Sequence, residues 1–306
     1  MIDERAKNKL IKQHYRLVGE HSAVKLCHWT KKSLLDEGFC YKQKFYGIQT
    51  HRCLQMTPAV LWCNQRCIFC WRRIEETLGA DMLNVELDEP SDIIDKAEEG
   101  QRLLLTGYGG IPYRVNQRKL REAQQPNQAA ISLSGEPTLY PGISDLVAEF
   151  KKRNYSTFLV SNGTQPNRLG NMDCLPTQLY ISLEASNRML HQKICNPIYS
   201  GAWDDINKTL SLLPSLDTRT VIRITAIKGF NMIDAPGYAR LIEKAQPDYV
   251  EVKAFMLVGG SRERLTLDNM PSHDEIESFA RELANELSYK VKDRKKDSRV
   301  VLLTKK

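Results

Sequence analysis

The sequence predicts an α/β fold in which strands and helices alternate along a single domain of 306 residues. Short apolar runs rich in β-branched residues recur along the chain, and amphipathic helical patterns lie between several of them. Neither internal repeats nor low-complexity linkers interrupt this alternation. The length also allows two domains, but one α/β barrel accounts for it equally well. In such folds the reacting groups collect at the carboxyl ends of the strands.

Six segments are predicted as strands because each is short, apolar and bounded by polar or turn residues. They are Ala130–Ser134, Thr157–Ser161, Gln178–Leu183, Thr220–Ile227, Tyr249–Phe255 and Arg299–Leu303. Ile143–Arg153 is predicted as a helix from the spacing of its apolar residues and its basic last turn. His273–Leu287 is predicted as another, because Ser272 precedes it and acidic residues fill its first turn. The residues before position 54 show no clear periodicity.

The composition excludes several classes of protein. A hydrophobic share of 42% is enough for a large core, and 26% charged residues is not the composition of a disordered chain. No run of 18 apolar residues is present, so we expect no membrane-spanning helix. The N-terminus lacks an apolar signal region, so we expect a cytoplasmic protein with reduced thiols and not a secreted disulfide scaffold.

The net charge of +7 is concentrated at the two ends of the chain. Residues 1–53 hold 11 basic and 5 acidic side chains, and residues 290–306 hold 8 and 2, so each end carries +6. The 236 residues between them hold 25 basic and 30 acidic side chains, a net of −5. Solvated surface lysines are one explanation. A phosphate-binding surface is the other, and Arg114–Arg121 and Lys151–Arg153 would add to it.

Cys63, Cys67 and Cys70 form a C-x3-C-x2-C motif. Three thiolates within eight residues can converge on one centre, and soft thiolates select zinc, copper(I) or iron–sulfur clusters. A structural zinc site needs a fourth ligand that this motif does not supply. A [4Fe–4S] cluster held by three thiolates leaves one iron open for another ligand. Zinc and merely structural thiols remain the alternatives.

Polar motifs also end three successive predicted strands, where ligands bind in α/β folds. They are Ser134-Gly135-Glu136-Pro137, Ser161-Asn162-Gly163 and Ser182-Leu183-Glu184, followed by Arg223 and Thr225 on a later strand and Lys253 on the next. Each motif alone could be an ordinary turn. Together with the cysteine motif, they resemble the radical S-adenosylmethionine (SAM) superfamily. The resemblance implies an open (βα)6 partial barrel of the TIM type, with Phe69 near the adenine of SAM and the strand-end residues in the SAM pocket.

Cys27, Cys40 and Cys53 are separated by two equal gaps of twelve residues. They could be scattered buried thiols, but a second three-cysteine cluster would explain the segment and would leave a second iron open. The segments around these cysteines, with Ser132–Pro141 and Asp297–Arg299, closely resemble the 4-demethylwyosine synthase family of tRNA modification. The resemblance extends from about residue 14 to residue 303. It divides one domain into an extension, 1–58, that holds the second cluster and a barrel, 59–306.

The resemblance implies a lyase that acts on N1-methylguanosine next to the anticodon of phenylalanine tRNA. A 5′-deoxyadenosyl radical would take a hydrogen atom from the N1 methyl group, and pyruvate would supply two carbons for a third ring. We expect a monomer that binds the anticodon stem-loop and takes electrons from a separate ferredoxin- or flavodoxin-type donor. Glu184 departs from the family, in which aspartate is more usual, and this puts its role in doubt.

Lys42 is the expected catalytic residue. It lies two residues after Cys40, and a lysine in a dry site can form an imine with a ketone such as pyruvate. An ordinary surface lysine is the alternative. A flipped base would need a stacking partner, for which the candidates are Trp29, Tyr41, Phe45, Tyr46, Trp62 and Trp71. Two rival functions remain: a radical SAM activating enzyme that uses no pyruvate, and a non-catalytic zinc or iron–sulfur RNA-binding module.

Overall fold

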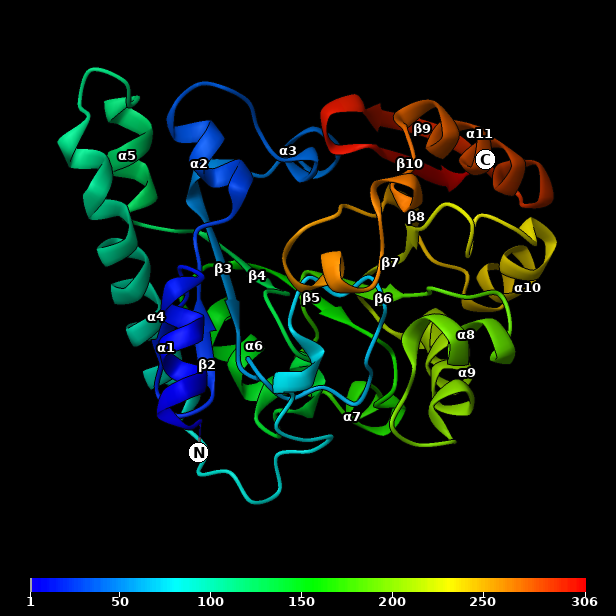
Figure 1. The fold of residues 1–306 in the computed structure, drawn as a ribbon, viewed down its shortest axis with the longest axis horizontal. Coiled ribbons are helices and arrows are strands. Elements are labelled where there is room, and N and C mark those ends of the chain that lie inside the picture. Colours follow the sequence, from blue (N-terminus) through cyan, green and yellow to red (C-terminus); the bar gives the residue numbers. More distant parts are fainter. Residues whose placement is uncertain (1) are drawn as a thin grey trace. The chain divides into compact units, whose positions relative to one another are not determined.

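The computed structural model describes residues 2–306, which divide into two compact units. The first unit contains the residues up to Cys63, Asp81–Val160 and Met172–Thr177. The second contains Asn64–Ala80, Ser161–Asn171 and Gln178–Lys306. Each unit has its own five strands and its own helices (Figure 1).

The first unit has a mixed sheet whose strands follow the order of the chain. These strands are β1 (Arg16–Val18), β2 (Ser22–Val24), β3 (Cys53–Thr57), β4 (Gln128–Ile131) and β5 (Ser156–Ser161). β1, β2 and β3 pair antiparallel, whereas β3, β4 and β5 pair parallel. β4 is wholly buried, as expected of a parallel strand covered on both faces.

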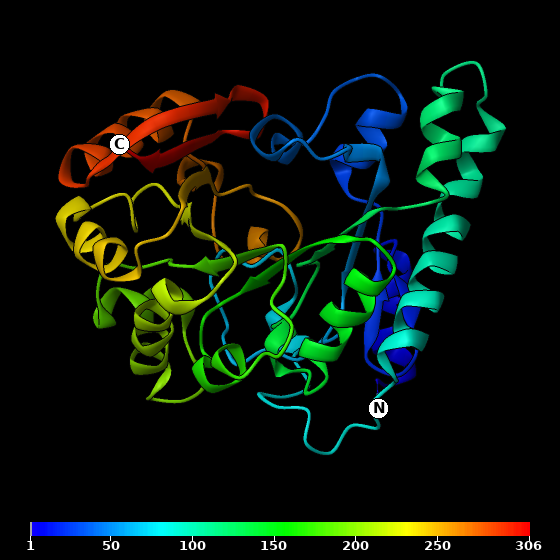
Figure 2. The same ribbon diagram turned by 180° about the vertical axis from the view of Figure 1, so that it is seen from behind.

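The helices of the first unit include three longer ones, α1 (Glu4–Lys12), α4 (Pro90–Leu105) and α6 (Ile143–Lys152). α1 and α4 lie along the antiparallel strands, and both views show α4 beside α1 (Figures 1 and 2). α4 buries Ile93, Ile94 and Ala97, which the helical repeat places on one face. The shorter helices are α2 (His28–Leu34), α3 (Tyr41–Tyr46) and α5 (Gln117–Ala123).

The second unit also has five strands, in the order β6-β7-β8-β10-β9. β6 (Gln178–Ser182), β7 (Arg219–Ala226) and β8 (Tyr249–Ala254) are parallel. β10 (Val300–Lys305) and β9 (Tyr289–Lys295) are added as an antiparallel hairpin. The helices are α7 (Pro166–Gly170), α8 (Arg188–Cys195), α9 (Ala202–Leu212), α10 (Ala235–Ala245) and α11 (His273–Glu286). α11 packs on the β9–β10 hairpin (Figure 1).

The six predicted strands and two predicted helices are confirmed, with ends that differ by no more than three residues. Ser272 caps α11 in a capping box with Glu275. The segment before residue 54, for which the sequence showed no clear periodicity, holds α1, β1, β2, α2 and α3. Strands of three residues are too short to produce a periodic pattern. Over residues 2–306, no helix is long and apolar enough to cross a membrane.

Candidate active site

The segment that leads into the first cysteine motif is aligned by the turn that follows β4. Ser134 Oγ donates to the carbonyl oxygen of Val60 at 2.8 Å. The Glu136 N–H donates to the carbonyl oxygen of Trp62, also at 2.8 Å. This turn is the first of the polar motifs predicted at strand ends. It positions the backbone immediately before Cys63.

Gly135 lies where this turn and the cysteine segment come closest. Its φ is +69°, in the left-handed region. A Cβ atom there would lie 1.8 Å from the carbonyl oxygen of Ala59 and 2.6 Å from that of Trp62. Both the backbone conformation and the available space require glycine at this position.

The Glu136 carboxylate is directed into its own turn. It is 2% exposed, and its Oε1 accepts hydrogen bonds from Thr138 N–H at 3.0 Å and Thr138 Oγ1 at 2.6 Å. Glu136 thus caps the short helix at Pro137–Leu139. Its expected place in the SAM pocket stays a prediction.

In the second unit, Asn64 connects the cysteine loop to the turn that contains Asn162 and Thr164. Asn64 Oδ1 accepts from Asn162 Nδ2 at 2.9 Å, and Asn64 Nδ2 donates to Thr164 Oγ1 at 2.8 Å. The Thr164 N–H donates to Asn162 Oδ1 at 3.0 Å, which closes the network. Asn64 and Thr164 were not singled out from the sequence, although Asn64 directly follows Cys63.

Ser161 and Gly163 shape the same turn. Ser161 is buried, and its Oγ accepts from Gly163 N–H at 3.0 Å. Gly163 has a φ of +76°, which a residue with a side chain rarely adopts. The Gly163 carbonyl oxygen accepts from Thr209 Oγ1 on α9 at 2.7 Å, so the turn is also fixed from the outside.

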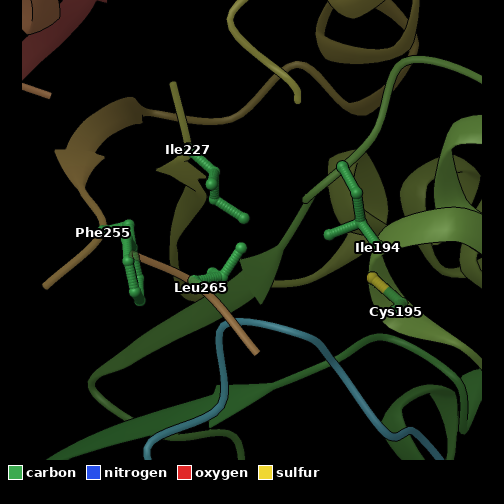
Figure 3. Close-up of a cluster of buried hydrophobic side chains, with 5 residues drawn as sticks. All are labelled: Ile194, Cys195, Ile227, Phe255 and Leu265. Atoms are coloured by element: carbon green, nitrogen blue, oxygen red, sulfur yellow. The ribbon is translucent and has the colours of Figure 1, made fainter. Parts of the chain in front are cut away.

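The cysteine loop packs against the end of α8. Cys67, Ile68 and Phe69 contact an apolar cluster made by Ile194, Cys195, Ile227, Phe255 and Leu265 (Figure 3). A hydrogen bond with the Cys195 thiol, followed by burial, raises the pKa of Cys67 well above its ordinary value. Neither spacing nor periodicity indicates this contact, because Cys195 and Cys67 lie far apart in the sequence.

Arg264 binds the other end of the cysteine loop. Its guanidinium donates to the carbonyl oxygens of Ile68 at 3.0 Å, Cys70 at 2.5 Å and Arg72 at 3.3 Å. One planar side chain thereby fixes three carbonyl groups within five residues. The sequence offered no sign of this role, because almost two hundred residues separate Arg264 from the loop it binds.

Glu184 is a buried carboxyl group bound to the neighbouring strand β7. Its two oxygens accept from Thr225 N–H at 2.7 Å and Thr225 Oγ1 at 3.0 Å. Burial raises the pKa of Glu184 to about 7, against the opposing effect of Thr225 and Arg223. The buried Asn231, which the sequence analysis missed, donates to the carbonyl oxygens of Glu184 and Thr225 at 3.0 and 2.9 Å.

Ser182 and Arg223 are partners in the parallel pairing of β6 with β7. The guanidinium carbon of Arg223 lies 5.8 Å from the centre of the Tyr180 ring. The structure therefore places two of the predicted residues, Ser182 and Arg223, side by side on adjacent strands, and Glu184 follows two residues after Ser182.

The three N-terminal cysteines belong to the first unit, on separate short elements. Cys27 and Cys40 are the N-cap residues of α2 and α3, and Cys53 begins β3. Burial raises the pKa of Cys53 to about 12; Cys27 and Cys40 raise it further, and Lys42 opposes them. These electrostatic contributions require the four side chains to lie near one another.

Lys42 occupies the second position of α3 and is 8% exposed. Its Nζ lies 4.7 Å from the centre of the Phe158 ring on β5, an arrangement typical of a cation–π contact. The alternative of an ordinary surface lysine is therefore wrong. The structure brings Lys42 into the same neighbourhood as Cys53.

Among the described residues, no three His, Cys, Asp or Glu side chains are arranged to hold a single metal ion. A [4Fe–4S] cluster is a larger group that takes thiolate ligands, and both sets of cysteines supply thiols. All eight cysteines are free of disulfides. The donor chemistry of both sets fits an iron–sulfur cluster.

Comparisons with known proteins decide the family. Residues 58–242 match the radical SAM superfamily, and residues 244–305 match a family described as wyosine base formation. A SAM-dependent tRNA 4-demethylwyosine synthase from Pyrococcus abyssi is 51% identical over 99% of this chain and 89% of its own length. The one from Methanocaldococcus jannaschii is 42% identical over 99% and 96%. The chain belongs to the tRNA 4-demethylwyosine synthases.

A solved structure of a 4-demethylwyosine synthase, described as TYW1 with a lysine–pyruvate adduct bound, has a TM-score of 0.90 at 41% identity. The match covers 99% of this chain and 96% of that one. The fold is thus the open partial barrel of radical SAM enzymes, as predicted. Membership in this family makes the chain an enzyme and implies SAM and a [4Fe–4S] cluster. It also excludes both rival functions.

Proposed function

We propose that this 4-demethylwyosine synthase acts on N1-methylguanosine beside the anticodon of phenylalanine tRNA, with pyruvate as the two-carbon donor. The observation that carries the proposal is the burial of Lys42 near a set of three cysteines. It agrees with the lysine–pyruvate adduct found in a relative of 41% identity. The family name supports tRNA as the substrate class.

In this proposal Cys63, Cys67 and Cys70 hold the first [4Fe–4S] cluster. The cluster and SAM, when bound, supply a 5′-deoxyadenosyl radical that takes a hydrogen atom from the N1 methyl group. Arg264 and Asn64 hold the cysteine loop through carbonyl and amide contacts. The residues proposed to contact SAM are Phe69, Gly135, Glu136, Ser161, Asn162, Ser182, Glu184 and Arg223.

Cys27, Cys40 and Cys53 hold a second [4Fe–4S] cluster in this proposal. The Cys53 thiol is inert as it stands, because burial raises its pKa to about 12, so a bound iron would be needed to stabilise its thiolate. Iron and sulfide analysis after anaerobic reconstitution tests this. About eight irons per chain supports two clusters of four, and about four irons would contradict the second one.

Lys42 binds pyruvate as an imine in this proposal. The neutral amine attacks the ketone carbon, a C–N bond forms, and the carbonyl oxygen leaves as water. The surrounding apolar contacts, including the Phe158 ring, keep water from reversing the step. Lys25 is a second candidate, because burial lowers its pKa to about 8.

Borohydride reduction with labelled pyruvate tests the imine and separates the two lysines. We expect label on wild-type protein and on Lys25→Ala, but none on Lys42→Ala. Lys44→Ala, an exposed lysine on the same helix, is the matched control and should incorporate label normally. Undiminished label on Lys42→Ala would overturn the assignment.

Substrate RNA would contact the basic ends of the chain in this proposal. The burial of Tyr41 and Trp62 makes them core residues and not stacking partners. The partly exposed aromatic candidates for stacking on the flipped base are Trp29, Phe45, Tyr46 and Trp71. We further propose a cytoplasmic monomer, reduced by a separate ferredoxin- or flavodoxin-type donor.

A further inference from the structure

The first unit contains a cavity of about 740 Å³ between α2, α3 and α5 (Figure 1). Its lining comes from the end of α2 and the loop after it, from α3 and the loop after it, and from the start of α5. Ligand pockets in proteins typically measure about 300–1,000 Å³. The cavity lining includes no cysteine and no residue that we place in the SAM pocket, so its occupant is still to be named.

His51 supplies a buried hydrogen-bond acceptor to this cavity. The residue lines the cavity and is 7% exposed, and its Nε2 lies 2.5 Å from Glu122 Oε2. A carboxylate only accepts, so Nε2 carries the proton and Nδ1 of the neutral ring is an acceptor. Among residues 2–306, no group donates a hydrogen bond to Nδ1 of His51 other than the neighbouring hydroxyl of Ser22-type contacts seen elsewhere, and none is present here.

Gln43 supplies a donor to the same cavity. Its Oε1 accepts from Thr50 N–H at 3.1 Å and from Thr50 Oγ1 at 2.7 Å, which fixes the orientation of the amide. No group in the described part of the chain accepts from its Nε2. Thr50 Oγ1 also accepts from Cys40 N–H at 3.0 Å, so this wall is joined to the second set of cysteines.

The charged residues that line the cavity are already neutralised by partners. Lys119 Nζ lies 2.6 Å from Asp36 Oδ1, and Lys32 Nζ lies 2.5 Å from Glu37 Oε2. The lining therefore does not select an anion. It suits an uncharged group that can both donate and accept hydrogen bonds.

The remaining lining residues favour a nucleotide. Phe39 is 38% exposed and offers an aromatic ring, and proteins bind unpaired RNA bases by stacking them on such rings and by hydrogen bonds to their edges. Arg118 also lines the cavity, and its exposed guanidinium can contact a phosphate group.

We propose that this cavity binds the base of a nucleotide next to the target base in the substrate RNA. Lys42 and Gln43 are consecutive on α3, where side chains point about 100° apart, so one short helix contributes to both sites. The target base must approach pyruvate to react with it, which brings its neighbours in the RNA close to α3. This inference rests on the proposed function and adds a second point of RNA recognition to it.

Binding of anticodon stem-loops that carry N1-methylguanosine tests the proposal. In two further RNAs, the nucleotide on one side or the other of N1-methylguanosine is replaced by an abasic one. Fluorescence anisotropy under anaerobic conditions measures their affinity for the reconstituted enzyme. We expect one abasic RNA to bind wild type about tenfold more weakly than the intact RNA, because a stacked base is lost.

Phe39→Ala should weaken binding of the intact RNA by a similar factor and should show no further loss with that abasic RNA. Phe39→Tyr keeps the aromatic ring and should bind as wild type does. Tyr113→Ala, which removes an exposed aromatic residue outside the cavity, is the matched control and should also bind as wild type does. An iron content equal to that of wild type confirms that each variant is loaded.

Full affinity of wild type for both abasic RNAs would overturn the proposal, and so would an undiminished abasic effect in Phe39→Ala. The nucleoside product tests the proposed function separately. If 4-demethylwyosine forms and neither abasic RNA binds more weakly, only the cavity assignment fails. If the abasic effect depends on Phe39 but no 4-demethylwyosine forms, the proposed reaction fails and RNA binding at the cavity stands.

Discussion

At the scale of single residues, the site is most constrained at two positions. Gly135 has no room for a Cβ atom, and Glu184 is a buried carboxyl group. The strand-end motifs that contain them could be identified from the sequence because both stand at predicted strand ends. The residues that contact the site from elsewhere in the chain could not be identified in this way. Asn64, Asn231 and Arg264 contact the site from distant positions, and neither spacing nor periodicity reports such contacts.

Gly135→Ala should destabilise the fold by about 3 kcal/mol, because the residue has a positive φ and no room for a Cβ. Thermal unfolding of the cluster-free chain measures the loss. Gly107→Ala is the matched control, because nothing lies within 4 Å of a Cβ there. Equal unfolding temperatures for the two variants would contradict the steric explanation.

The raised pKa of Glu184 predicts that the stability of the folded chain depends on pH. Its folded pKa of about 7 lies above the ordinary 4.5, so the folded chain holds this proton more tightly than the unfolded chain. The carboxyl group therefore costs no stability below pH 4.5, and its cost grows to about 3 kcal/mol as the pH rises through 7. Glu184→Gln removes this cost and keeps an acceptor for Thr225.

Urea unfolding of cluster-free wild type and Glu184→Gln at pH 5 and pH 8 measures the difference. The variant should gain stability relative to wild type at pH 8 and show little difference at pH 5. A constant difference between the two chains across this range would show that Glu184 does not titrate there.

At the scale of elements, the β9–β10 hairpin shows which strands can be predicted from the sequence and which cannot. Strands with apolar, β-branched runs were predictable, because burial on both faces leaves a clear signature. β9 was not, because it alternates buried and exposed positions and carries lysines on the exposed side. The sequence showed that this segment is basic, but it did not show that the segment forms a strand.

Arg264→Met should loosen the cysteine loop by leaving the carbonyl groups of Ile68, Cys70 and Arg72 without their shared donor, at a cost of about 1–3 kcal/mol. We expect faster iron loss from the reconstituted chain during a chelator challenge. Arg262→Met, which changes an exposed arginine in the same loop, should lose iron at the wild-type rate. Equal rates for both variants would rule out this role.

The basic C-terminal end can be tested without truncation, which would remove the buried strand β10. Lys290, Lys292 and Lys296 are exposed, and changing all three to glutamine should weaken tRNA binding. The slope of log affinity against log salt should fall by about 2–3. The same change at Lys208, Arg240 and Lys244 is the charge-matched control. Identical slopes for the two triple variants would reject the surface.

At the scale of the whole molecule, one chain combines two compact units with two sets of three cysteines. The division of the chain at residue 58 into an extension and a barrel stays a prediction. Cys63 ends a segment of the first unit, whereas Cys67 and Cys70 belong to the second.

The most direct test of the account is the nucleoside produced by the anaerobically reconstituted enzyme. Phenylalanine tRNA that carries N1-methylguanosine is incubated with SAM and a reductant, with or without pyruvate, and its nucleosides are separated and weighed by mass spectrometry. We expect 4-demethylwyosine only when pyruvate is present, and none from Lys42→Ala. The same product without pyruvate, or at the wild-type level from Lys42→Ala, would contradict it.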